Sequence, residues 1–177
     1  GAIGASGAAV DTAAARLALL ANGGGIYVDN TAADLDLLAT ATGSGSDVEI
    51  TSSGNIALRA VTALSDDVVL AAGGAITDNN GATVNVSARA LDISGNGIGT
   101  LADPLELEVD QISANGGAGG AFVVNAGPLA ITEDSLEGQG AAQLVFDATA
   151  ITILDIADNV AALDPNGSVT FRTATGD

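Results

Sequence analysis

Apolar and polar side chains alternate in a pattern that returns every 20 residues. The pattern D-V-x-[I/L]-x-x-x-G-x-I begins at Asp47 and again at Asp67, and a looser copy begins at Leu91. Alternation with a period of two is typical of a β-strand that buries one side. Each copy therefore predicts two short strands, separated by a break at a glycine.

One such unit cannot bury its apolar edge alone, whereas stacked units can, because equivalent side chains then pile into columns. The repeat predicts an all-β fold, a parallel β-helix (β-solenoid) with about 20 residues per turn, as a single segment over residues 1–177. At about 4.8 Å per turn, eight or nine turns would give a rod about 40 Å long. We expect Gly54, Gly74 and Gly97 at corners that need a positive φ.

Two further signals concern particular segments. Residues 12–21 (TAAARLALLA) have strong helix propensity, although they align with an alternating segment 95 residues later. We expect a strand at 16–20, with a short helix or cap as the alternative. The same offset relates Tyr27 to Phe122 and Asn30 to Asn125. We expect the two aromatic rings to stack in the core or at a corner, with a sugar-binding platform as the alternative.

Composition excludes several kinds of chemistry. The net charge is −18, the only basic residues are four arginines, and there is no histidine, lysine or cysteine. Thiolate or imidazole zinc sites, haem ligation, disulfides, Ser–His–Asp triads and lysine Schiff bases are therefore excluded. Nucleic acid is not an expected partner, because the chain repels phosphate. Hydrophobic residues make up 47% of the chain, which favours folding over disorder.

Neither end of the chain carries a recognisable targeting or helix-boundary signal. The sequence has no cationic leader, and no apolar run approaches the roughly 20 residues of a membrane helix. Both ends lie in stretches rich in small residues, without helix start or stop signals. This pattern favours a segment of a longer repeat protein.

Carboxylates are the plentiful reactive groups. Close sets occur at Asp34/Asp36, Asp66/Asp67, Glu106/Glu108, Glu133/Asp134 and Asp155/Asp158. On a strand, Glu106 and Glu108 would both point outward, as a glycosidase-like acid/base pair or a polysaccharide lyase site would require. The favoured interpretation is a solvated acidic face that keeps the rod soluble. We therefore expect no catalytic and no cofactor-binding residue.

Calcium and phosphate are the other ligands to consider. Segment 43–47 is a partial match to a calcium-binding β-roll, and 78–81 (DNNG) is either a calcium loop or a turn. Structural calcium and its ligands stay open at this point. The glycine clusters at 23–25 and 116–120 are interpreted as corners, since neither has the lysine of a phosphate loop. The arginines are expected to pair with nearby carboxylates.

Three segments of the chain resemble the repeats of filamentous-haemagglutinin-like adhesins. They are 67–77 (DVVLAAGGAIT), 98–110 (IGT followed by PLELEVD) and 119–123 (GGAFV). Those adhesins are giant repeat proteins on or outside Gram-negative cells. The resemblance implies a right-handed β-helix, secretion, and a role in adhesion or surface structure, and it supplies no catalytic residue.

We therefore expect a non-enzymatic structural or adhesive protein, extracellular or at the cell surface. It would be a β-helical shaft segment or a filament subunit that stacks end to end. Its partners would be further repeats of the same chain or other copies stacked head to tail, with a host or neighbouring-cell surface or a glycan as a further candidate. The alternatives are a β-helix enzyme that degrades polysaccharide and a carbohydrate-binding module.

Overall fold

The computed structural model describes residues 1–138, 143–153 and 168–173. This part of the chain contains strands and no helix, as the alternation predicts. The strands are β1 (Val10–Thr12), β2 (Arg16–Asn22), β3 (Ile26–Asn30), β4 (Asp34–Thr42), β5 (Val48–Ser52), β6 (Asn55–Ala72), β7 (Ile76–Asp78), β8 (Val86–Ser94), β9 (Leu105–Gly117), β10 (Ala121–Asn125), β11 (Pro128–Gly138), β12 (Gln143–Ala148), β13 (Ala150–Ile153) and β14 (Ser168–Thr173). The predicted strand at 16–20 is confirmed as part of β2.

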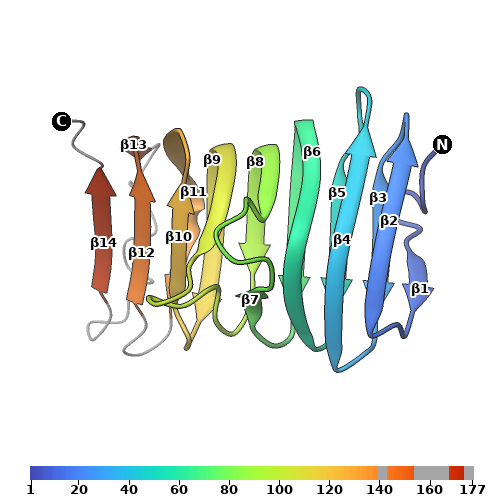
Figure 1. The fold of residues 1–177 in the computed structure, drawn as a ribbon, viewed down its shortest axis with the longest axis horizontal. Helices are drawn as coiled ribbons and strands as arrows, with labels where there is room; N and C mark the ends of the chain where they lie inside the picture. The colour runs from blue at the N-terminus through green and yellow to red at the C-terminus, as the bar shows by residue number, and fades with distance from the viewer. Residues whose placement is uncertain (139–142, 154–167, 174–177) are drawn as a thin grey trace.

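The strands stack as a right-handed parallel β-solenoid. Each strand pairs in parallel with its counterpart about 21 residues further along the chain. Figure 1 shows β2 and β4 at the front pointing up, and β3 and β5 behind them pointing down, while the chain advances from right to left. This sense of winding is right-handed. The predicted fold class is thus confirmed.

The core consists of columns of apolar side chains that run along the axis of the rod. One column contains Ile26, Val48, Val68, Leu91, Ile112 and Ile131. Another contains Leu35, Ile56, Ile76, Ile98 and Ala121. Every member of both columns is at most 1% exposed. Full burial of each large side chain contributes about 1.5–3 kcal/mol, so the columns hold the coils together.

The described part of the chain forms about six turns, fewer than the eight or nine that division of the whole length predicts. Part of the difference lies in loops that add residues without adding a coil. The loop at 79–85 joins β7 to β8, and the loop at 99–104 precedes β9. A regular repeat length in the sequence does not reveal such insertions.

The glycines of the repeat are needed for a different reason from the one predicted. Gly97 has φ +123°, as expected, but Gly54 and Gly74 are not among the described glycines with positive φ. A Cβ atom at Gly54 would overlap the carbonyl oxygen of Ala33 on the preceding coil. A Cβ atom at Gly74 would overlap Oδ1 of Asn55. Close stacking of corners therefore requires these two glycines.

The expectation that Tyr27 and Phe122 stack together is wrong. Each ring is half-buried and occupies an outward position of its strand, between two buried neighbours. Tyr27 lies on β3, beside Glu49 of β5, whereas Phe122 lies on β10, beside Val145 of β12. These strands belong to distant coils, because the spacing of 95 residues covers several turns. The two aromatic residues therefore form no common platform.

Candidate functional site

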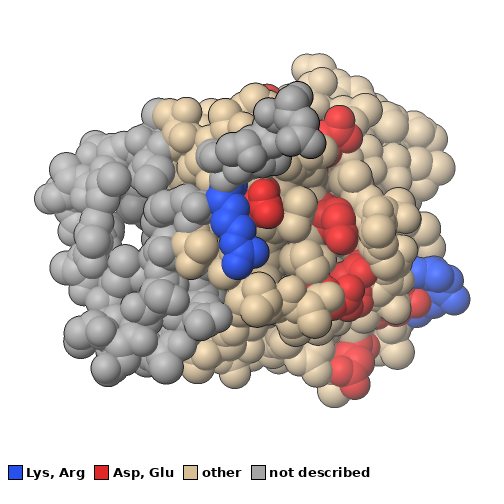
Figure 2. All heavy atoms as spheres, turned by 60° about the vertical axis from the view of Figure 1, so that its left-hand side comes forward, with Lys and Arg blue, Asp and Glu red and all other residues tan. Residues whose placement is uncertain are grey.

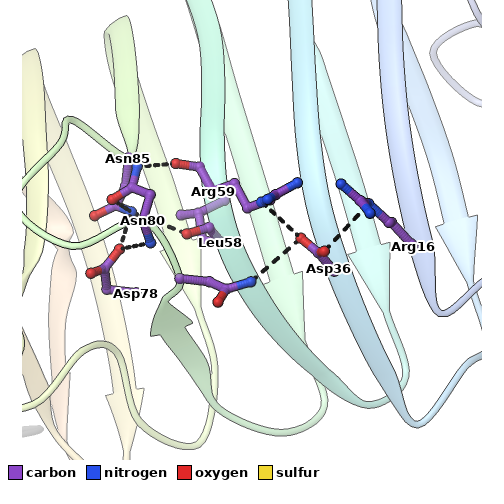
Figure 3. Close-up of polar contacts among 8 residues, drawn as sticks. Arg16, Asp36, Leu58, Arg59, Asp78, Asn80 and Asn85 are labelled. Carbon is purple, nitrogen blue, oxygen red and sulfur yellow. Dashed lines mark hydrogen bonds and ion pairs between the residues drawn. The ribbon is translucent and has the colours of Figure 1, made fainter.

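A buried asparagine with several hydrogen bonds lies on the side of the rod. Asn85 is 0% exposed, and its side chain takes part in four hydrogen bonds. Figure 3 shows Asn85 beside Leu58, Asp78 and Asn80. Nδ2 donates to the carbonyl of Leu58 at 3.1 Å, to Oδ1 of Asp78 at 2.7 Å and to Oδ1 of Asn80 at 3.1 Å. Oδ1 accepts from the N–H of Glu106 at 2.9 Å. One side chain thus connects three successive coils.

The loop at 79–85 is folded onto this asparagine. The N–H of Asn80 donates to Oδ1 of Asp78 at 2.9 Å, which is an Asx turn. Nδ2 of Asn80 donates to the carbonyl of Arg59 and, at 3.4 Å, to that of Val84. At 78–81 the Asp78 carboxylate thus forms a turn, which is one of the two alternatives that the sequence leaves open.

A row of alternating charges lies on the same side of the rod, towards the N-terminus (Figure 3). Asp36 lies between two arginines, with Oδ2 3.4 Å from Nε of Arg16 and Oδ1 3.5 Å from Nε of Arg59. Nδ2 of Asn79 also reaches Oδ1 of Asp36, at 3.5 Å. Arg16 is 64% exposed, so this row is a surface feature that adds little stability.

The environment of Glu106 on β9 changes the acidity of its carboxyl group. Burial raises the pKa of Glu106 above its ordinary value, and the negative charges of Asp78 and Asp103 raise it further. The hydrogen bond at its own backbone opposes this rise in pKa. Oε2 is enclosed and has no hydrogen-bond partner, while the rest of the side chain is half-exposed. Glu106 can therefore hold a proton at a higher pH than an ordinary glutamate.

Glu106 and Glu108 both occupy outward positions of β9, as predicted. Glu108 is exposed and accepts a 3.5 Å hydrogen bond from the hydroxyl of Ser87. The other predicted carboxylate sets have local partners: Asp34 accepts from Asn55 and Asp66 from the N–H of Gly45. Figure 2 shows acidic side chains spread over one face of the rod rather than gathered in one hollow.

Most of the arginines form ion pairs, and the described acidic residues form no metal-binding cluster. Asp67 pairs with Arg89, whose Nη2 lies 2.5 Å from Oδ2, so three of the four arginines pair with nearby carboxylates as predicted. Asp155 and Asp158 lie outside the described residues, and so do the side chains of Glu133 and Asp134. Within the described ranges, no three acidic side chains are placed to hold a metal ion, in segment 43–47 or elsewhere.

Sequence reasoning missed the structural role of buried asparagines. Asn30, Asn85 and Asn125 are 0–3% exposed and lie where strands meet corners. Oδ1 of Asn30 accepts from the N–H of Ala14, and Oδ1 of Asn125 accepts from the N–H of Val109. Each amide thus satisfies backbone groups where the sheet ladder is interrupted. The recurrence of Asn30 as Asn125 was the available signal.

The first coil leaves its outer edge open. Leu17 and Leu19 are half-buried, whereas Leu37 and Ala39, their partners on the next coil, are 0% exposed. In the described chain β2 pairs with β4 alone. At β2, the apolar columns and the sheet ladder therefore end at an edge that no other described strand covers, whereas β3 is covered by β1.

The backbone shows which groups of β2 point to this open side. The carbonyl of Ala15 accepts from the N–H of Asp36 on β4. Because direction alternates along a strand, the N–H and C=O of Ala18 point away from β4. The terminal ammonium of Gly1 donates to the carbonyl of Asn22 at 2.7 Å, on that same open side. Arg16 and Ala18 thus present unpaired backbone groups at the end of the rod.

No helix of the described chain is long and apolar enough to cross a membrane. Comparisons with known proteins found no match to the chain among family models, curated proteins or solved structures.

Proposed function

We propose that the chain is a non-enzymatic structural element, a β-helical shaft segment whose coils continue by end-to-end stacking. The open first coil carries this proposal. Its half-buried Leu17 and Leu19 and the unpaired backbone groups of β2 form the same kind of surface that each internal coil buries against the next.

An uncovered strand edge is a template for pairing with another strand. A contact between unlike ends need not close into a ring, so it generates an open rod or filament. Further repeats of the same chain or another copy would cover β2 in the same parallel arrangement as β4 does on its other side. The resemblance of the repeats to filamentous-haemagglutinin-like adhesins supports a place for this rod outside the cell or at its surface.

The experiment is electron microscopy and sedimentation of the purified chain over a range of concentrations, with and without calcium. Ala18→Pro removes an N–H on the open side of β2 and should leave the ladder to β4 intact. Ala18→Ser keeps the N–H and is the matched control. We expect end-to-end assemblies for the wild type and for Ala18→Ser, and single short rods for Ala18→Pro. Single rods for all three proteins would rule out stacking between copies.

A further inference from the structure

A corner of the rod, away from the open first coil, exposes a large apolar side chain that the stacking of coils does not require. Leu64 lies within β6, where the strand passes between two faces, and it is 71% exposed. No other large apolar side chain of the described residues is as exposed. In a repeat whose apolar positions point inward, this outward leucine needs its own explanation.

Leu64 separates two hollows along this corner. The hollow on the N-terminal side has a volume of about 360 Å³ and is lined by the turn at 41–44 and by Thr62, Ser65 and Asp66. The hollow on the C-terminal side has a volume of about 350 Å³ and is lined by Ala88, by 108–110 and by the turn at 126–128. Most of these residues are small, so the hollows exist because side chains on both sides of Leu64 are short.

The two hollows form one trough parallel to the axis. Its walls come from five successive coils. Residues 40, 62, 87 and 108 are paired in register on four of them, and the N–H of Ala126 on the fifth donates to the carbonyl of Leu107. Four spacings of about 4.8 Å give a length of about 19 Å. An extended peptide of about six residues has the same length.

The trough is negatively charged. Asp66, Glu108 and Asp110 line it, and these carboxylates form no ion pair within the described chain. The basic side chain at this corner, Arg89, is already paired with Asp67. The occupant that matches the surface must therefore supply both positive charge and an apolar side chain.

We propose that this trough binds an extended basic segment of another protein, in which lysines or arginines alternate with aliphatic residues. The aliphatic side chains pack against Leu64 and the alanines beside it, and the cations face Asp66, Glu108 and Asp110. This function goes beyond the structural role proposed above and does not depend on end-to-end stacking.

The test uses two fluorescent hexapeptides of equal charge, one of alternating lysine and leucine and one of alternating lysine and serine, titrated with the purified chain. We expect the leucine peptide to bind more tightly than the serine peptide. Leu64→Ser should weaken binding of the leucine peptide about tenfold, which corresponds to about 1.4 kcal/mol, and leave the serine peptide unchanged. Leu101→Ser, at another leucine that is 61% exposed, is the matched control.

A second variant tests the charges. Replacement of both Glu108 and Asp110 by their amides should weaken both peptides and reduce the dependence of binding on salt. The proposal is overturned if the two leucine variants behave alike, if the two peptides bind equally well to the wild type, or if neither peptide binds at low salt. Equal binding would show that the peptides respond only to the overall negative charge.

Discussion

Replacement of Asn85 tests whether a single buried amide holds three coils together. In Asn85→Ala the N–H of Glu106 loses its acceptor, and the carboxylate of Asp78 loses its 2.7 Å donor. The carbonyl of Leu58 and Oδ1 of Asn80 each lose one donor, and the carbonyl of Leu58 keeps the N–H of Asn79 at 3.0 Å. Because Asn85 is 0% exposed, solvent does not replace these partners without a rearrangement.

The expected magnitude follows from the losses at Glu106 and Asp78. An unpaired buried donor costs about 1–3 kcal/mol, and a lost hydrogen bond to a charged group costs about 1.5–3 kcal/mol. We therefore expect Asn85→Ala to lower the free energy of unfolding by about 3 kcal/mol. Asn79→Ala removes an exposed amide whose side chain has one 3.5 Å contact, so it should change the free energy by less than about 0.5 kcal/mol.

The assay is equilibrium unfolding in urea, followed by far-ultraviolet circular dichroism. Asn85→Asp adds a decisive comparison, since aspartate has the shape of asparagine but at neutral pH cannot donate. At neutral pH this substitution should be at least as destabilising as alanine. At acid pH the introduced carboxylate gains a proton and can donate again, so part of the lost stability should return. The reasoning is refuted if Asn85→Ala and Asn79→Ala unfold at the same urea concentration.

Three further predictions concern single residues. Burial and a nearby carboxylate raise the pKa of Glu106, so the stability it contributes is present below its ordinary pKa and is lost as the pH rises through the raised value. Glu106→Gln should remove this loss, and unfolding curves from pH 4 to pH 8 check it. Gly54→Ala should destabilise the rod because its Cβ atom would overlap backbone, whereas Gly127→Ala, with open space around it, should have little effect in thermal unfolding. Burial, followed by the charge of Asp47 and a second acidic neighbour, raises the pKa of Tyr27 above 10.0. As the single tyrosine of a chain without tryptophan, Tyr27 can be titrated by absorbance, and Asp47→Asn should lower its pKa.

The repeat made the fold predictable because it reports directly on which side chains share a column. Val48 and Val68 are 20 residues apart in the sequence and are direct partners in the sheet. Residues 16–22 form strand β2 despite the helix propensity of residues 12–21. Pairing with β4 stabilises the strand more than its own hydrogen bonds would stabilise an isolated short helix. Helix propensity is therefore a weak predictor where a neighbouring coil can pair with the whole segment through backbone hydrogen bonds.

The polar site was not predictable in the same way. Asn85 and Glu106 are 21 residues apart and lie in segments without common motif letters. Their contact depends on how the loop at 79–85 folds back onto the preceding coil, and the number of residues in a loop does not fix that path. The raised pKa of Glu106 likewise depends on neighbours from other coils, which no periodic pattern specifies.

The sequence alone determined the strands, their parallel stacking and the identity of the buried columns, because alternation and repeat length fix which face of each strand is apolar. It also determined the acidic surface, since there are 22 acidic residues and only 4 basic ones. Only the tertiary structure decided which glycines are required by close packing, which asparagines replace missing ladder bonds, and where Leu64 lies between two hollows. Those features depend on distances between neighbouring coils, and such distances exist only once the coils are stacked.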